Sequence, residues 1–334
     1  MKSLLTTLLT TAFIVPLSLS AANATNLFAA AAFTKAQQNS PVPTDAGLFI
    51  RSESGEWESY GPKIQAVSSA SVDPSDRRIV FLACGNGIIR TTNAGESWRL
   101  VTGWEISDAT AIVIDPKNGR NVYAATGWGL WKSTDGGDSW TSCNRGLTET
   151  FSKTIILDRK DSDRLLVGTG GGLFVSSNRA VTWTRIIDVP PTNILRLRRG
   201  VSDPETWLAV TEGHGAWLST DDGESWQQTA PDLSYANLYG AAVDPTNSDN
   251  LAVSGWGVGV WISSDGGSTW TDRSAGLPSP NVNALAYDPN HQGRLFASAF
   301  EEGTVFSDDA GGAWNDGGLY GAYVSDLGFA PINP

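Results

Sequence analysis

Three of the 14 tryptophans stand in predicted turns, where an exposed ring could bind a ligand. Trp128 and Trp256 are each flanked by glycines, and Trp104 lies in a longer connection. An indole at the tip of a glycine-rich turn offers a flat apolar face for stacking, with a polar N–H at its edge. The alternative is that neighbouring loops cover these rings and make them part of the core.

Other side chains of the same turns could add hydrogen bonds to such a ligand. His214 occupies the turn equivalent to that of Trp128, and Tyr235, Tyr239 and Tyr323 lie in nearby connections. Aligning the repeats described below places one residue of each at the start of a strand: Ala66, Asp108, Phe151, Asn193, Asn237, Asn281 and Tyr323. The asparagines and the aspartate predict a polar ring for a hydroxyl-rich ligand. The alternative is that each of them caps its own turn.

A hydrolytic reaction on a glycan would need two positioned carboxylates. The acidic residues of the same connections are Asp108, Glu149, Asp188, Glu212, Asp232, Glu301, Glu302 and Asp326. No motif marks out a pair among them, so the catalytic residues stay unassigned and enzymatic activity stays open.

The sequence predicts no cofactor and no metal site. Its two cysteines are too few for a zinc site, and neither has an obvious histidine partner in a catalytic arrangement; no calcium-ligand spacing appears. Whether Cys84 and Cys143 form a disulfide stays open, because an exported protein would permit one.

These candidates are positioned by a sevenfold repeat. A turn of the form Ser/Thr-x-Asp-x-Gly-x-Ser/Thr-Trp, called the box below, ends at Trp57, Trp98, Trp140, Trp183, Trp226, Trp270 and Trp314. The steps between them are 41 to 44 residues, which is the length that one four-stranded propeller blade needs. The sequence therefore predicts an all-β protein, a seven-bladed β-propeller of four-stranded antiparallel blades.

The box is expected between the third and fourth strands of each blade. Short hydroxyl and carboxylate side chains bond to nearby amides, glycine takes a positive φ, and tryptophan packs between strands. A strand that opens with glycine precedes the box, as in Gly129–Ser133, and the first strand of a blade ends in Asp-Pro, as at Asp115. The candidate ligand residues then fall on the face opposite the boxes.

The boxes and the Asp-Pro-ended strands resemble those of the Asp-box (BNR) repeat β-propellers, over nearly the whole chain after residue 24. That group includes sialidases, xyloglucanases, Vps10-domain receptors and photosystem II assembly factors, and the resemblance implies a ligand site away from the boxes. The chain departs from sialidases, which typically have fewer blades and a Phe/Tyr-Arg-Ile-Pro motif, and from xyloglucanases, whose acids lie between two propellers. Arg196-Leu-Arg-Arg199 is similar to the arginine patch of the assembly factors; the alternative is an ion-paired strand.

The two ends of the chain are expected to complete one blade together. Residues 323–331 look like a first strand with no blade after it, Asn26–Phe33 like a second strand and Gly47–Arg51 like a third. Closing the last blade with strands from both termini removes exposed sheet edges. Residues 25–334 thus form a single propeller domain, with a polar insertion at 34–46.

Residues 1–24 predict a cleaved signal peptide, with Lys2 before an apolar stretch and Ala22-Asn-Ala24 at the cleavage site. The protein is then expected in a periplasm or secreted, without stable membrane insertion. A net charge of −12 argues against nucleic acid and anionic membranes as partners.

Together these features favour a monomeric binding or assembly module that captures a glycan or an extracytoplasmic protein segment. The alternatives are a glycoside hydrolase and a chaperone for a membrane complex, similar to the photosystem assembly factors.

Overall fold

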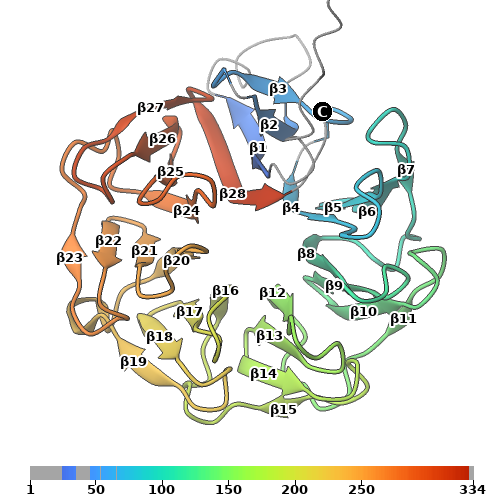
Figure 1. Ribbon diagram of the computed structural model, residues 1–334. Coiled ribbons are helices and arrows are strands. Elements are labelled where there is room, and N and C mark those ends of the chain that lie inside the picture. Colours follow the sequence, from blue (N-terminus) through green and yellow to red (C-terminus); the bar gives the residue numbers. More distant parts are fainter. Residues whose placement is uncertain (1–24, 35–45, 53, 65, 331–334) are drawn as a thin grey trace, which may run out of the picture.

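The computed structural model describes residues 25–34, 46–52, 54–64 and 66–330. They form seven four-stranded antiparallel sheets arranged as blades around a central axis (Figure 1). The predicted seven-bladed propeller is therefore confirmed. The predicted signal peptide and residues 35–45 of the predicted insertion lie outside the described residues.

Each blade runs from strand A beside the axis to strand D at the rim, and the lists that follow take blades 1 to 7 in order. The A strands are β4 (Val67–Val72), β8 (Ala109–Ile114), β12 (Ser152–Leu157), β16 (Ile194–Arg199), β20 (Leu238–Val243), β24 (Val282–Tyr287) and β28 (Ala322–Ala330). The B strands are β5 (Val80–Cys84), β9 (Val122–Thr126), β13 (Leu165–Thr169), β17 (Trp207–Thr211), β21 (Leu251–Gly255), β25 (Leu295–Ala299) and β1 (Asn26–Thr34).

The C strands are β6 (Gly87–Thr91), β10 (Gly129–Ser133), β14 (Gly172–Ser176), β18 (Ala216–Ser219), β22 (Gly259–Ser263), β26 (Gly303–Ser307) and β2 (Gly47–Arg51). The short D strands are β7 (Arg99–Leu100), β11 (Thr141–Ser142), β15 (Thr184–Arg185), β19 (Gln227–Thr229), β23 (Thr271–Asp272), β27 (Asn315–Gly318) and β3 (Trp57–Ser59). A 3₁₀ turn, η2 (Pro231–Leu233), precedes β20.

Blade 7 closes the ring with strands from both ends of the chain. β28 pairs antiparallel with β1 from Asn26 opposite Ala330 to Thr34 opposite Ala322, and β1 pairs in turn with β2. Figure 1 shows the red β28 beside the blue β1. The predicted closure by both termini is confirmed, and its two long strands make the most extensive pairing in the molecule.

The core consists of apolar layers between neighbouring blades. One layer joins Tyr123 of blade 2 to Leu165, Phe174 and Trp183 of blade 3, all nearly inaccessible to solvent. The B strands of blades 1 to 6 are buried along their whole length because both of their faces contact such layers. No blade could bury these surfaces alone, so the ring is the unit of stability.

Five of the seven box tryptophans connect successive blades by hydrogen bonds as well as by packing, whereas the indoles of Trp98 and Trp226 donate within their own turns. The indole N–H of Trp183 donates to the carbonyl of Cys143 in blade 2 at 2.8 Å, and that of Trp314 donates to the carbonyl of Arg273 in blade 5 at 2.7 Å. Trp57, Trp140 and Trp270 make equivalent bonds to the preceding blade.

Within each box, the side chains satisfy the backbone of the turn. In blade 5, the Ser263 hydroxyl donates to Asp265 and accepts from the Gly267 amide, both at 2.8 Å. Asp265 also accepts from the backbone and hydroxyl of Thr269, at 2.8 and 2.6 Å. Gly267 has a φ of +86°, as the turn requires.

The box turns and the A-to-B turns lie at the same end of the propeller, which we call the box face. The amides of Gly136 and Gly266, in two of the boxes, donate to the carbonyls of Arg120 and Asp249, which lie two residues before strands B of the same blades. The opposite end, made of the B-to-C turns and the connections between blades, is called the upper face.

Cys84 and Cys143 are both free. They are buried in different apolar layers, and burial raises the pKa of each thiol to about 12. The disulfide that the sequence left open does not form.

The box carboxylates make stability depend on pH. The hydrogen bonds from Thr269, and then that from Ser263, lower the pKa of Asp265 to about 2 from 3.8. Because the folded-state pKa is the lower one, this contribution is complete above about pH 4 and is lost as the pH falls through about 2. We expect Asp265→Asn to reduce the fall in melting temperature over this range, measured by circular dichroism.

Asn93 and Asn178 already stand at the equivalent position of two other boxes. Asn178→Asp is the matched control and should steepen the same acid transition. An unchanged pH profile in both variants would contradict the role assigned to the box carboxylate.

Candidate functional site

Every A strand carries a β-bulge near its start, at the upper face. The pairing between strands A and B skips one residue in each blade: Ser68, Thr110, Lys153, Leu195, Tyr239, Asn283 and Ser325. All seven line one cavity of about 290 Å³ at the upper mouth of the central channel. We call them the mouth ring.

The mouth ring lies two residues beyond the ring that the sequence predicted. Of the predicted ring, Ala66 and Tyr323 also line the cavity. Asp108 instead accepts the indole N–H of Trp128 at 3.0 Å, and Asn281 accepts the amide of Gly257 at 2.8 Å. These two side chains therefore hold the B-to-C turns that carry the exposed tryptophans.

An edge-to-face chain of aromatic rings crosses the upper face over blades 5 to 7. The ring centroids of Trp256 and Phe300 are 4.9 Å apart, and those of Phe300 and Tyr323 are 5.5 Å apart. Trp256 remains 53% exposed, and Tyr323 lines the mouth cavity. We call these three residues the aromatic chain, which leads from a turn tip to the channel.

Phe300 was missed in the sequence, although a signal for it exists. It directly follows β25, just as Trp256 directly follows β21. Glycines flank Trp256 and mark its turn in the sequence, whereas glutamates follow Phe300. The two positions were therefore not identified as equivalent from the sequence.

The remaining predicted aromatic residues lie apart from this chain. Trp128 is 68% exposed, with its indole N–H held by Asp108. Trp104 and Tyr235 are 94% and 88% exposed, and no described aromatic ring contacts either of them. Tyr239 belongs to the mouth ring and lies in β20, whereas the sequence placed it in a connection between blades.

Three predicted polar residues lie on the upper face of blades 4 and 5. Glu212 accepts from the amide of Asn193 at 3.2 Å, and the backbone carbonyl of His214 accepts from the Trp217 indole at 3.0 Å. Asn237 is exposed directly before β20.

Asp326 lies inside the channel and not in an upper-face connection, because it sits in the middle of β28. Its Oδ1 accepts from Arg196 at 3.0 Å and from Arg198 at 2.8 Å, and both arginines belong to β16. Arg196 also donates to the carbonyl of Ser325 at 2.8 Å. The expected position of Asp326 is therefore wrong, and the ion pairs span the channel from blade 4 to blade 7.

The arginine run of β16 is ion-paired, which agrees with the alternative left open in the sequence. Arg199 approaches the fully buried Glu205 at 3.5 Å, and Arg159 of blade 3 donates to the same carboxylate at 2.9 Å. Burial lowers the pKa of Arg198 and of Arg199, against the opposing effect of Asp326 and Glu205.

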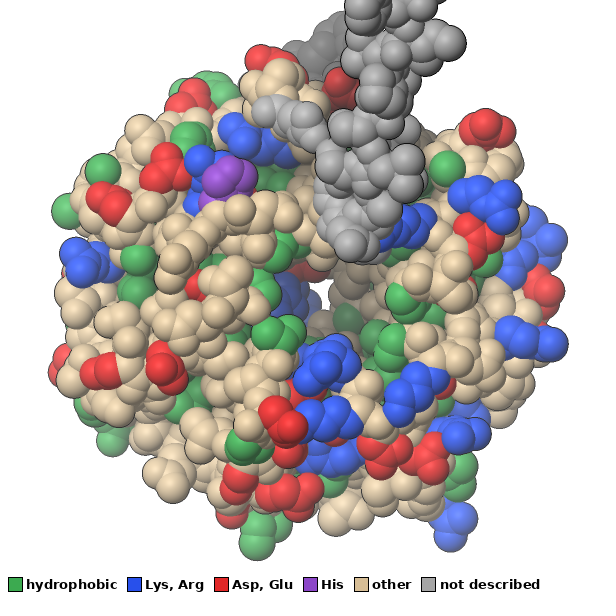
Figure 2. Space-filling view, viewed as in Figure 1, with side chains coloured by type: hydrophobic (Ala, Val, Ile, Leu, Met, Phe, Trp, Pro, Cys, Tyr) green, Lys and Arg blue, Asp and Glu red, His purple; other side chains and the backbone are tan. Residues whose placement is uncertain are grey.

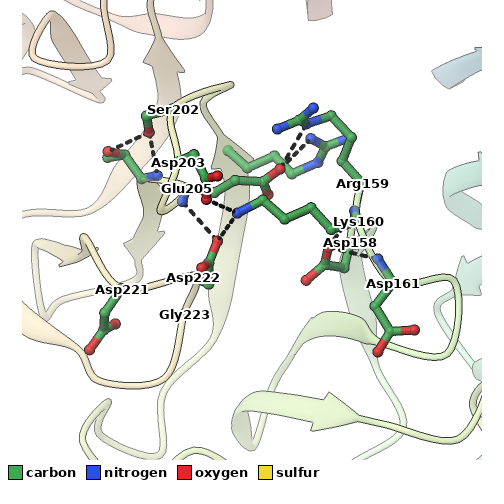
Figure 3. A network of polar contacts seen from close by, with 12 residues as sticks. Asp158, Arg159, Lys160, Asp161, Ser202, Asp203, Glu205, Asp221, Asp222 and Gly223 are labelled. Carbon is green, nitrogen blue, oxygen red and sulfur yellow. Dashed lines mark hydrogen bonds and ion pairs between the residues drawn. The ribbon is translucent and has the colours of Figure 1, made fainter.

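A second network joins blades 3 and 4 at the box face. Figure 2 shows acidic and basic side chains gathered beside the central opening, over β12–β13 and β16–β17. In the close view, Lys160 reaches Asp203 at 2.5 Å and Asp222 at 3.0 Å (Figure 3). Asp222 also accepts the Glu205 amide at 2.8 Å, so this network connects loops within the scaffold.

Among the described residues, no group of three or more His, Cys, Asp or Glu side chains could hold a metal ion. Nor does any described helix have the length and apolarity needed to cross a membrane.

Comparisons with known proteins identify the architecture only. No family model and no curated protein matches the chain. The GH74 enzyme of Niastella koreensis superposes with a TM-score of 0.69 at 19% identity, covering 89% of this chain and 52% of that one. The GH74 xyloglucanase of Xanthomonas campestris gives 0.61 at 18%, covering 85% and 51%.

A structure of YCF48 bound to a D1 peptide gives a TM-score of 0.56 at 19% identity, covering 75% of this chain and 81% of that one. The chain thus spans about half the length of the two GH74 proteins and most of YCF48. These neighbours are β-propellers, in agreement with the fold described above.

The cross-channel ion pairs should matter more for stability than surface pairs do. Asp326→Asn leaves two confined arginines without their carboxylate and should lower the free energy of unfolding by about 2–3 kcal/mol. The loss is smaller than for a fully buried pair because both arginines keep some contact with solvent. The matched control is Asp138→Asn, at an exposed carboxylate that pairs with Arg90 at 2.9 Å and should cost about 1 kcal/mol or less.

Urea unfolding measures both variants. Equal losses in the two variants would contradict a structural role for the ion pairs across the channel.

Proposed function

We propose that this protein is an exported glycan-binding module that captures its ligand on the upper face. The observation that carries the proposal is the aromatic chain Trp256–Phe300–Tyr323, which leads from an exposed turn into the mouth cavity. Aromatic faces suit the apolar faces of sugar rings, and an exposed aromatic surface of this kind usually has a binding role.

The mouth ring supports a ligand rich in hydroxyl groups. Five of its seven side chains, those of Ser68, Thr110, Tyr239, Asn283 and Ser325, carry a hydroxyl or an amide group. The side-chain nitrogen of Asn283 has no hydrogen-bond partner although the residue is only 7% exposed. Such groups both donate and accept hydrogen bonds, as sugar hydroxyls require.

Trp128 adds a second aromatic platform on the same face. Its indole N–H is held by Asp108, which fixes the orientation of the ring while most of the ring stays exposed. In this proposal Asp108 and Asn281 orient turns, and Trp128 and Trp256 stack on the ligand. The export itself rests on the signal peptide predicted at residues 1–24.

A protein segment is the second candidate ligand. The observation that favours it is the similarity to YCF48, whose structure contains a bound D1 peptide. In that case, the protein would serve as an assembly factor. A hydrolase remains the alternative suggested by the similarity to GH74 enzymes, and it would require two carboxylates facing the bound glycan.

The proposal predicts that Trp128→Ala combined with Trp256→Ala weakens glycan binding about thirtyfold without unfolding the protein. Each lost stacking ring should weaken binding by about 1 kcal/mol. Leu100→Ala is the matched control, because Leu100 is exposed on the outermost strand of blade 1. Binding is followed over time on a glycan array, with circular dichroism as the measure of folding.

Each other outcome has a distinct meaning. Unfolding of the double variant would make the rings part of the core and overturn the proposal. A signal that decays as the sugar is cut would replace it with hydrolysis. Capture of a peptide with no affinity for any glycan would replace it with the assembly function.

A further inference from the structure

The mouth cavity contains a lysine without a partner carboxylate. Lys153 is the mouth-ring residue of blade 3, and none of the described carboxylates lies within ion-pair distance of it. Its ammonium group lies 5.2 Å from the ring centroid of Phe151. An aromatic face is a weak partner for a cation that could instead pair with an anion.

The charges near Lys153 leave an excess of positive charge. Arg196 lines the same cavity, and it shares the single carboxylate of Asp326 with Arg198. Three cations against the two carboxylates of Asp326 and Glu212 leave one positive charge in excess. The net charge of the whole chain is −12, so the local charge at the channel mouth has the opposite sign to the charge of the protein.

The pKa of Lys153 reflects this lack of compensation. Burial, and then the charge of Arg196, lower the pKa of Lys153 below its ordinary value of 10.5, while Glu212 opposes the shift. Lys153 is still exposed at the channel mouth, so an anion can approach its ammonium group from solvent. The charge of such an anion would offset the repulsion between Lys153 and Arg196.

We infer that the channel mouth binds a carboxylate, so that the glycan captured by the upper face carries a uronic acid. This inference rests on the proposed glycan-binding function and specifies the class of glycan. The sugar that follows the aromatic chain beyond Tyr323 enters the cavity and places its carboxylate at Lys153 and Arg196. Thr110 and Asn283 line the same cavity and face the remaining hydroxyl groups.

The acidic surface makes this recognition selective. An extended polyanion meets repulsion over most of a protein with a charge of −12, whereas a single carboxylate at the channel axis meets only the local excess of cations. The inference therefore concerns glycans with individual or terminal acidic sugars that can enter the mouth.

The test uses the folded mature chain with short oligomers of galacturonate, glucuronate and mannuronate, each paired with its carboxyl-reduced counterpart. Calorimetry should show at least one acidic oligomer bound about tenfold or more tightly than its reduced form, as expected for a charge-assisted contact. Lys153→Gln should abolish this preference by weakening binding of the acidic oligomer to about the affinity of its reduced form, and Lys153→Arg should restore most of it.

Lys132→Gln is the matched control, because it changes the net charge equally but lies on strand C of blade 2, where Lys132 bonds to the carbonyl of Arg179. It should keep the preference for the acidic oligomer.

The outcomes separate this inference from the proposed function. Equal binding of acidic and reduced oligomers, still weakened in the double tryptophan variant, would overturn the inference and leave the glycan-binding function intact. A preference that survives Lys153→Gln would place the carboxylate elsewhere and overturn the inference. Binding of a peptide carboxylate but of no oligomer would overturn both.

Discussion

The whole architecture depends on the contact that each blade makes with the one before it. A four-stranded blade has two apolar faces, and only a neighbour on each side can bury both. In five of the seven boxes the tryptophan contributes to this contact twice, because its ring packs between blades while its indole N–H bonds to the preceding blade, as Trp183 does with Cys143. The serine and the aspartate of the box fix the turn from which the tryptophan projects. In a closed ring these contacts support one another, and the pairing of β28 with β1 completes the circle.

Closure also determines where variable chemistry can be placed. All seven A strands surround the axis, and all seven bulge near the same end, so one residue per blade is displaced toward the channel mouth. The backbone repeats at these positions while the side chains differ, from Ser68 and Thr110 to Lys153, Leu195 and Tyr239. The scaffold thus supplies a fixed ring of seven positions, and the identities of the side chains at those positions set the ligand. This separation explains why propellers of one architecture host unrelated activities.

The fold was predictable because it depends on periodicity, whereas the site depends on local departures from it. Box spacing and the strand-like ends predicted seven blades and closure by both termini, as found. The sequence placed the polar ring two residues too early in each blade, because a β-bulge leaves no trace in the repeat spacing. Asp108 and Thr110, for example, lie at the start of the same strand. Asp326 was misplaced in a connection although it lies within the first strand that the sequence predicted at residues 323–331. Phe300 was missed because only its position after β25, and not its flanking residues, matches that of Trp256.

The channel shows why an arginine run in a sequence does not by itself define a binding patch. Arg198 and Arg199 are drawn into pairs with Asp326 and Glu205, and the desolvation that lowers their pKa values makes these pairs structural. Lys153 lies in the same channel without such a pair. Because Lys153 is exposed at the channel mouth and has no carboxylate within ion-pair distance, it is the cation available to a ligand. The contrast between the paired arginines and the unpaired lysine directs the search for function to the upper mouth, where the aromatic chain also ends.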